Sequence, residues 1–119
     1  MIQFFIQRWR SIGFACQGIG VLLRTQPNAW VHAAATLAVV ALGVSVRISR
    51  LEWALLALAI GTVWAAEALN TGIEFVVDLV SPDHHELAGK AKDVAAAGVL
   101  LASMAAVLVG LLVFVPYLL

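Results

Sequence analysis

Residues 94 to 119 read VAAAGVLLASMAAVLVGLLVFVPYLL and contain no charged side chain. A helix needs about 20 predominantly apolar residues to cross the hydrocarbon core of a bilayer, so this stretch predicts a membrane span over residues 94–116. Two further apolar stretches precede it. Residues 29–46 predict a first span, and residues 53–80 predict a second span that extends past the membrane through polar turns. The order of these stretches predicts three spans.

The composition of the whole chain agrees with a membrane protein. Of 119 residues, 63% are hydrophobic and 12% are charged, and the mean hydropathy is +1.01. Soluble domains carry about 45–50% apolar and about 25% charged residues. A chain this short cannot bury such an excess, which excludes a soluble globular monomer. Lys plus Arg balance Asp plus Glu at seven each, so no net charge points to nucleic acid. We expect one all-α integral membrane domain over residues 1–119.

The first 28 residues differ from the three apolar stretches. Their apolar side chains recur at steps of three or four residues, and arginines lie between them. This pattern is typical of an amphipathic helix that lies in the membrane interface. The apolar positions are Phe4, Phe5, Trp9, Ile12, Ala15 and Ile19. We therefore predict an N-terminal interfacial helix over residues 1–28.

The distribution of basic residues predicts the orientation. Five of them belong to the N-terminal arm and to the loop after the second span, and two lie between the first two spans. The larger group is Arg8, Arg10, Arg24, Lys90 and Lys92, and the smaller is Arg47 and Arg50. Because Lys and Arg are enriched in cytoplasmic loops, the N-terminus and residues 81–93 are predicted to face the cytoplasm.

A polar stripe follows one face of the second span. Its members are Glu67, Asn70, Thr71, Glu74 and Asp78. At 100° per residue they fall within an arc of roughly 100°, over an axial rise of about 16 Å. Ionisable groups inside a span are costly and usually face a bundle interior or a wet cavity. A helix that merely emerges into solvent explains polarity at Asp78, but it does not explain a single stripe that starts at Glu67.

The stripe suits phosphate chemistry. Mg²⁺ prefers a few carboxylates together with phosphate oxygens, and phosphoryl transfer needs that metal, a cation near the phosphates and an oriented nucleophile. Lys92 can supply the cation, and a carboxylate such as Glu67 can take a proton from a hydroxyl. The same stripe is also compatible with a subunit of an ion or proton pathway. A structural assembly factor is a third hypothesis.

The histidines and Ser81 have simpler interpretations. His84 and His85 are adjacent, but no Cys or HExxH pattern accompanies them, so a metal site is not indicated. Ser81 followed by Asp83 predicts the start of a helix with acidic residues in its first turn. His32, near the start of the first span, is interpreted as an interface residue.

The string EALNTGIEFVVDLVSPDHHELAGKAKD, from Glu67 to Asp93, resembles the signature of the prokaryotic diacylglycerol kinase family of small membrane lipid kinases. Several polar residue types recur at fixed offsets along it, which makes the match specific. The resemblance implies a homotrimer in the bacterial inner membrane, multi-pass, with active sites at subunit interfaces near the cytoplasmic surface. It also implies ATP as co-substrate and Mg²⁺ as cofactor.

The resemblance further implies roles for individual residues. Glu67 would be the catalytic base on the lipid hydroxyl, Asn70 would orient the site, and Glu74 would bind the metal on ATP. Gln26 stands where family members commonly have an acidic second metal ligand; its carbonyl can bind Mg²⁺ but adds no charge. The expected nucleotide contacts are Phe14, Gln26, Glu74, His84, His85, Lys92 and Asp93.

The lipid substrate is an expectation from the same resemblance. The family contains diacylglycerol kinases and undecaprenol kinases, which share the catalytic motif. The segments NAWVH (28–32), VDLVSP (77–82) and FVP (114–116) look more like the undecaprenol branch. We therefore expect conversion of undecaprenol to undecaprenyl phosphate, with conversion of diacylglycerol to phosphatidic acid as the alternative.

Overall fold

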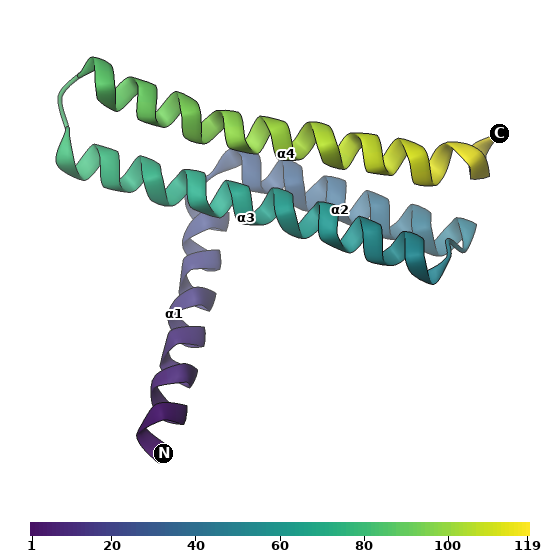
Figure 1. Cartoon of the computed structure of the whole chain (residues 1–119), viewed down its shortest axis with the longest axis horizontal. Helices are drawn as coiled ribbons and strands as arrows, with labels where there is room; N and C mark the ends of the chain where they lie inside the picture. The colour runs from purple at the N-terminus through teal and green to yellow at the C-terminus, as the bar shows by residue number, and fades with distance from the viewer.

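The computed structural model describes all 119 residues and is entirely helical (Figure 1). The helices are α1 (Ile2–Thr25), α2 (Pro27–Val46), α3 (Arg50–Val80) and α4 (Glu86–Leu118). Three of them, α2, α3 and α4, are long and apolar enough to cross a membrane. The predicted all-α class with three candidate spans is confirmed.

The helices begin earlier than the apolar stretches because of local capping. Pro27 opens α2, where its fixed φ and missing N–H are tolerated. At the start of α3, the Ser49 hydroxyl accepts from the Glu52 N–H, and the Glu52 carboxylate accepts from the Ser49 N–H. This reciprocal capping box fixes the start of α3 at Arg50.

The prediction of a helix start at Ser81 is wrong. Ser81 ends α3, where its N–H donates to the Val77 carbonyl and its hydroxyl donates to the Asp83 carbonyl. The chain then stays non-helical until His85, which caps α4 by accepting the Leu87 N–H at Nδ1. An imidazole nitrogen therefore performs the capping that the sequence pattern assigned to a serine hydroxyl, and α4 begins at Glu86.

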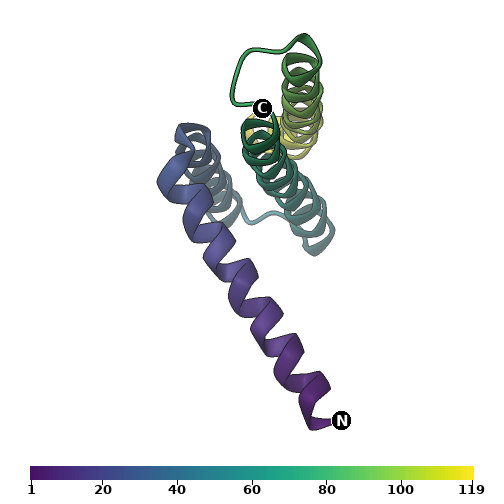
Figure 2. The ribbon, with the colours of Figure 1, turned by 90° about the vertical axis from the view of Figure 1, so that its left-hand side faces the viewer.

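Helices α3 and α4 lie side by side and antiparallel, and α2 lies against α3 (Figures 1 and 2). Toward the 81–85 loop, α3 and α4 continue past the start of α2 (Figure 1). Helix α1 runs across the direction of the other three and leaves the bundle (Figure 2). The α1–α2 corner is fixed by Trp30, whose Nε1 donates to the Leu23 carbonyl at 2.9 Å.

The buried apolar core of the single chain is small and lies toward the α2–α3 turn. It consists of Ile48, Leu56, Val113 and Phe114. Most large apolar side chains outside this cluster are exposed, including Leu58 at 70%. Exposed apolar side chains along spanning helices are expected where the surroundings are lipid or other helices rather than water.

Candidate active site

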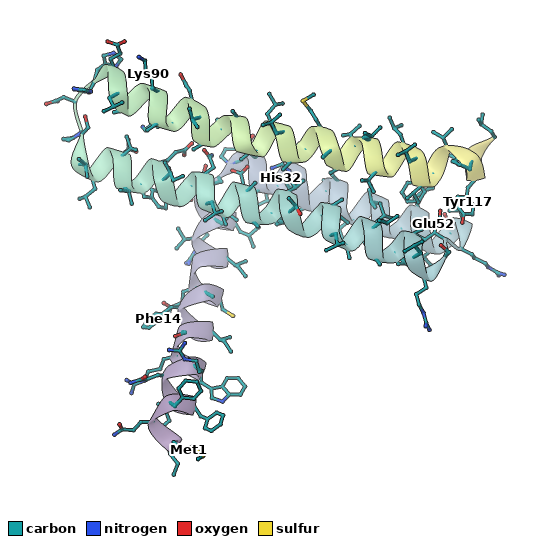
Figure 3. The ribbon with its side chains drawn as sticks, viewed as in Figure 1. Met1, Phe14, His32, Glu52, Lys90 and Tyr117 are labelled. Carbon is teal, nitrogen blue, oxygen red and sulfur yellow. The ribbon has the colours of Figure 1, made fainter.

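Glu67 is the most deeply placed acidic residue of the chain. It lies on α3, it is 1% exposed, and it is the largest fully buried side chain. Its Oε2 lies 3.1 Å from Nε2 of His32 on α2. His32 is within the bundle, whereas the labelled residues of α1 project away from it (Figure 3). The interpretation of His32 as an interface residue is wrong, because α2 packs with this face toward α3.

One turn further along α3, Asn70 and Glu74 form a pair. The Asn70 Nδ2 donates to Glu74 Oε1 at 3.2 Å. Asn70 and Thr71 are buried at 8% and 4% exposure. Asn70 Oδ1 and Thr71 Oγ1 nevertheless have no hydrogen-bond partner in the chain. Because buried polar atoms are almost always paired, these two oxygens point to a partner outside the single chain.

The exposed end of the stripe joins α3 to α4. Asp78 forms an ion pair and hydrogen bond with the Lys92 ammonium. The two residues border a polar cavity of about 180 Å³ between the ends of the helices. His84 and His85 line the same cavity, and His85 also caps α4. The structure therefore brings three of the predicted nucleotide residues together beside Asp78.

The other four predicted nucleotide residues do not line this cavity: Glu74, discussed above, and Phe14, Gln26 and Asp93. Phe14 is 68% exposed and lies midway along α1, away from the bundle (Figure 3). Gln26 is half-buried at the α1–α2 corner, where its amide donates to the Thr25 hydroxyl. Asp93 is exposed on α4 and takes part in no ion pair. A single chain does not assemble the full predicted nucleotide set.

The residues around Glu74 fit a magnesium ion bound together with phosphate. The half-buried Glu74 carboxylate and the unpaired Asn70 Oδ1 are hard oxygen ligands. The chain contains no group of three or more His, Cys, Asp or Glu side chains that could hold a metal alone. Mg²⁺ is usually bound by one or two carboxylates plus substrate phosphates, so one carboxylate with an amide oxygen suits it.

An apolar groove of about 210 Å³ is lined at one end by His32, the hydrogen-bond partner of Glu67. His32, Thr36 and Trp64 line one end, and Val107 and Gly110 line the other. The Trp64 Nε1 donates to Thr36 Oγ1 at 3.1 Å, which ties α2 to α3 beside Glu67. The sequence interpretation did not single out Thr36 or Trp64, and it did not place His32 in the site. Their signal was polar side chains spaced by four residues in an apolar span, His32 and Thr36, which places both on one face.

The chain was compared with known proteins. A profile of the prokaryotic diacylglycerol kinase family matches residues 13–114. An undecaprenol kinase of Bacillus subtilis is 42% identical over 91% of this chain and 88% of its own length. A diacylglycerol kinase of Synechocystis is 41% identical over 92% of this chain and 63% of its own length. A diacylglycerol kinase of Escherichia coli is 48% identical over 39% of this chain and 38% of its own.

These matches agree with the resemblance carried by the motif from Glu67 to Asp93, and they extend it to nearly the whole chain. They favour the kinase hypothesis over the ion-pathway and assembly-factor hypotheses. ATP follows as the phosphoryl donor that a kinase family implies. The chain belongs to the prokaryotic diacylglycerol kinase family, and it is a multi-pass membrane lipid kinase of the diacylglycerol kinase and undecaprenol kinase type.

Proposed function

We propose that this protein transfers the γ-phosphoryl group of ATP to undecaprenol, in a Mg²⁺-dependent reaction at the cytoplasmic surface of the bacterial inner membrane. The observation that carries the proposal is the placement of Glu67. It is buried, it is hydrogen-bonded to His32, which lines an apolar groove, and it begins a polar face that leads to the loop cavity.

The reaction assigns one task to each residue of this face. The Glu67 carboxylate accepts the proton of the lipid hydroxyl as that oxygen forms a bond to the γ-phosphorus. The bond from this phosphorus to the bridging oxygen breaks, and ADP leaves. Glu74 would hold Mg²⁺, which when bound would supply positive charge to the phosphates. Asn70 keeps the Glu74 carboxylate in place through the 3.2 Å hydrogen bond.

The loop cavity takes the nucleotide phosphates in this proposal. Lys92, His84 and His85 border it, and a Lys ammonium is a suitable point charge for phosphate oxygens. Asp93 follows Lys92 and contacts the remainder of the nucleotide. Asp78 pairs with Lys92, which holds the ammonium between α3 and α4.

Assembly into a homotrimer completes the site. Phe14 is exposed, and its position along α1 is too far from the bundle for it to reach the loop cavity of its own chain (Figure 3). The unpaired oxygens of Asn70 and Thr71 likewise call for partners beyond one subunit or from the substrates. We place Phe14 and Gln26 at the nucleotide of a subunit interface, with Gln26 as the neutral second metal ligand.

The loop end of the bundle faces the cytoplasm in this proposal. Lys90 lies at this end, and Glu52 and Tyr117 lie at the opposite end (Figure 3). The predicted cytoplasmic basic residues exceed those of the other side by five to two. Lys and Arg enrichment on the cytoplasmic side supports this orientation.

The apolar groove receives the start of the lipid chain. Ala35 lines it and its neighbour Ala34 does not, although both are exposed in the single chain. Ala35→Leu is expected to raise the KM for the lipid and to leave the KM for ATP unchanged. Ala34→Leu adds the same volume outside the groove and is the matched control. An equal rise in the lipid KM for both variants would contradict the placement.

The choice of undecaprenol as substrate rests on the share of each relative's length that this chain matches. The undecaprenol kinase of Bacillus subtilis is matched over 88% of its length, and the Synechocystis diacylglycerol kinase over 63% at nearly the same identity. The test supplies undecaprenol and diacylglycerol separately to reconstituted protein with labelled ATP and Mg²⁺. Higher turnover with saturating undecaprenol is expected. Higher turnover with diacylglycerol would reverse the assignment within the same mechanism.

A further inference from the structure

We propose that His32 is a positioning residue for this reaction: its Nε2–H donates to Glu67 Oε2 and leaves Glu67 Oε1 free to take the proton of the lipid hydroxyl. The inference rests on the proposed function, in which Glu67 is the base. His32 acts through Glu67 and does not itself contact the phosphoryl group.

The contact is the only side-chain hydrogen bond that Glu67 makes. The side chains of His32 and Glu67 are 16% and 2% exposed, and the donor and acceptor lie 3.1 Å apart. A carboxylate that is buried without a donor is strongly unfavourable in apolar surroundings. In an apolar span, the histidine therefore supplies the polar contact that lets this carboxylate remain at the site.

The His32 ring packs against Trp64, whose indole is in turn tied to α2 by Thr36. The two rings meet edge to face, with ring centroids 6.0 Å apart. Trp64 Nε1 donates to the Thr36 hydroxyl, and this hydroxyl donates to the His32 carbonyl at 2.7 Å. Trp64 lies one turn from Glu67 on α3, and Thr36 lies one turn from His32 on α2. Together these contacts join α2 to α3 next to Glu67, the proposed catalytic base.

A fixed carboxylate matters because proton transfer depends on geometry. Glu has three rotatable side-chain bonds, and a hydrogen bond to one oxygen selects among their conformations. Misplacement of a reacting group by about 1 Å can lower a rate by about 100-fold. Loss of His32 should therefore lower kcat and leave the KM for ATP unchanged, because His32 does not line the loop cavity proposed for the nucleotide phosphates.

The experiment measures kcat and both KM values for reconstituted variants with Mg-ATP and the lipid alcohol that the wild-type protein turns over. His32→Leu is expected to lower kcat by about 100-fold with the KM for ATP changed less than about twofold. His32→Gln retains a side-chain N–H of similar reach and should recover at least about one tenth of wild-type kcat. Recovery by Gln separates hydrogen bonding from packing, because a purely structural role would not require a donor.

Thr36→Val and Thr62→Val form a matched pair. Each hydroxyl donates to the carbonyl four residues earlier at 2.7 Å, but only Thr36 also accepts from Trp64. Thr36→Val should lower kcat several-fold, and Thr62→Val should not change it.

A second arm uses Glu67→Gln. If this variant keeps wild-type turnover, the proposed base is wrong and the inference falls with it. If Glu67→Gln loses turnover but His32→Leu keeps wild-type kcat, only the role of His32 is overturned. Equal losses in His32→Leu and His32→Gln would also overturn it. Added to Glu67→Gln, His32→Leu should not reduce the residual rate further, because His32 acts through the carboxylate.

Discussion

The two ends of the α3–α4 pair both carry acidic residues, yet they use them differently. At the end near the α2–α3 turn, Glu52 accepts from the Ser49 N–H and from the Tyr117 hydroxyl, and the apolar cluster of Ile48, Leu56, Val113 and Phe114 packs beside it. Toward the loop end, from Glu67 onward, Glu67 is buried and hydrogen-bonded to His32, and buried Asn70 and Thr71 each have an oxygen without a partner.

The difference separates a structural end of the bundle, around Glu52, from a functional end, which runs from Glu67 to the 81–85 loop. Polar groups that are fully paired within one chain stabilise that chain and need nothing more. Buried polar groups that stay partly unpaired reduce stability, and proteins retain such groups mainly where they bind or react. We therefore expect substitutions near Glu52 to change stability and substitutions near Glu67 to change turnover.

The largest effect in this comparison is expected for Glu74→Gln. Loss of this carboxylate removes the charged metal ligand of the proposed site, and turnover at limiting Mg²⁺ should fall by more than about 100-fold. The measurement is turnover across a Mg²⁺ titration. Partial recovery at high Mg²⁺ is expected, and unchanged turnover at every Mg²⁺ concentration would remove Glu74 from the metal site.

The next largest effect is a loss of stability expected for Gly43→Ala at the structural end. A Cβ on Gly43 would lie 2.7 Å from the Trp53 ring and 3.1 Å from Ile48. Gly43→Ala should therefore destabilise the protein by about 1–3 kcal/mol through overpacking. The midpoint of detergent-induced unfolding measures this, and specific activity of the folded protein should not change. Gly98→Ala is the control, because nothing lies within 4 Å of its Cβ position in the chain.

The loop end predicts a specific change in nucleotide binding for Lys92→Met. A charge-assisted hydrogen bond contributes about 1.5–3 kcal/mol, so the KM for ATP should rise about tenfold or more. The unfolding midpoint should change little, because the ion pair with Asp78 is partly exposed. Lys90→Met is matched to it: Lys90 pairs only with exposed Glu86 on its own helix. Equal KM values for the two variants would contradict the placement of the phosphates at Lys92.

The smallest effect is expected for Tyr117→Phe. The change removes the hydrogen bond that the Tyr117 hydroxyl donates to Glu52 and keeps the ring. It should lower stability slightly, with turnover unchanged. The unfolding midpoint and the initial rate at saturating substrates measure both quantities. A lower rate with unchanged stability would place part of the active site near Glu52 and contradict the comparison.

Much of the fold could be predicted because its signals are local. The apolar stretches predict α2, α3 and α4, and the 3.6-residue period places Glu67, Asn70 and Glu74 on one face. The start of α4 could not be predicted in the same way. Ser81 and His85 both offer an acceptor for capping, and only the path of the loop decides between them.

The partner of Glu67 also required the structure. The period of a helix shows which residues share a face, but it does not show which helix covers that face. His32 precedes Glu67 by 35 positions and becomes its partner only through the packing of α2 against α3. The same limit applies to Phe14, whose neighbours in the proposed trimer are not determined by its own helix.

The most direct test applies one substitution at two positions of α3, Glu52 in its first turn and Glu67 near its middle. Glu67→Gln and Glu52→Gln each replace a carboxylate by an amide, and phosphorylation of undecaprenol by labelled ATP is measured for both in the same vesicles. Glu67→Gln should lower kcat by about 100-fold or more while the protein stays folded. Glu52→Gln should have wild-type turnover and a lower midpoint of detergent-induced unfolding. Wild-type turnover by Glu67→Gln, or a comparable loss in both variants, would contradict the assignment of Glu67 as the base.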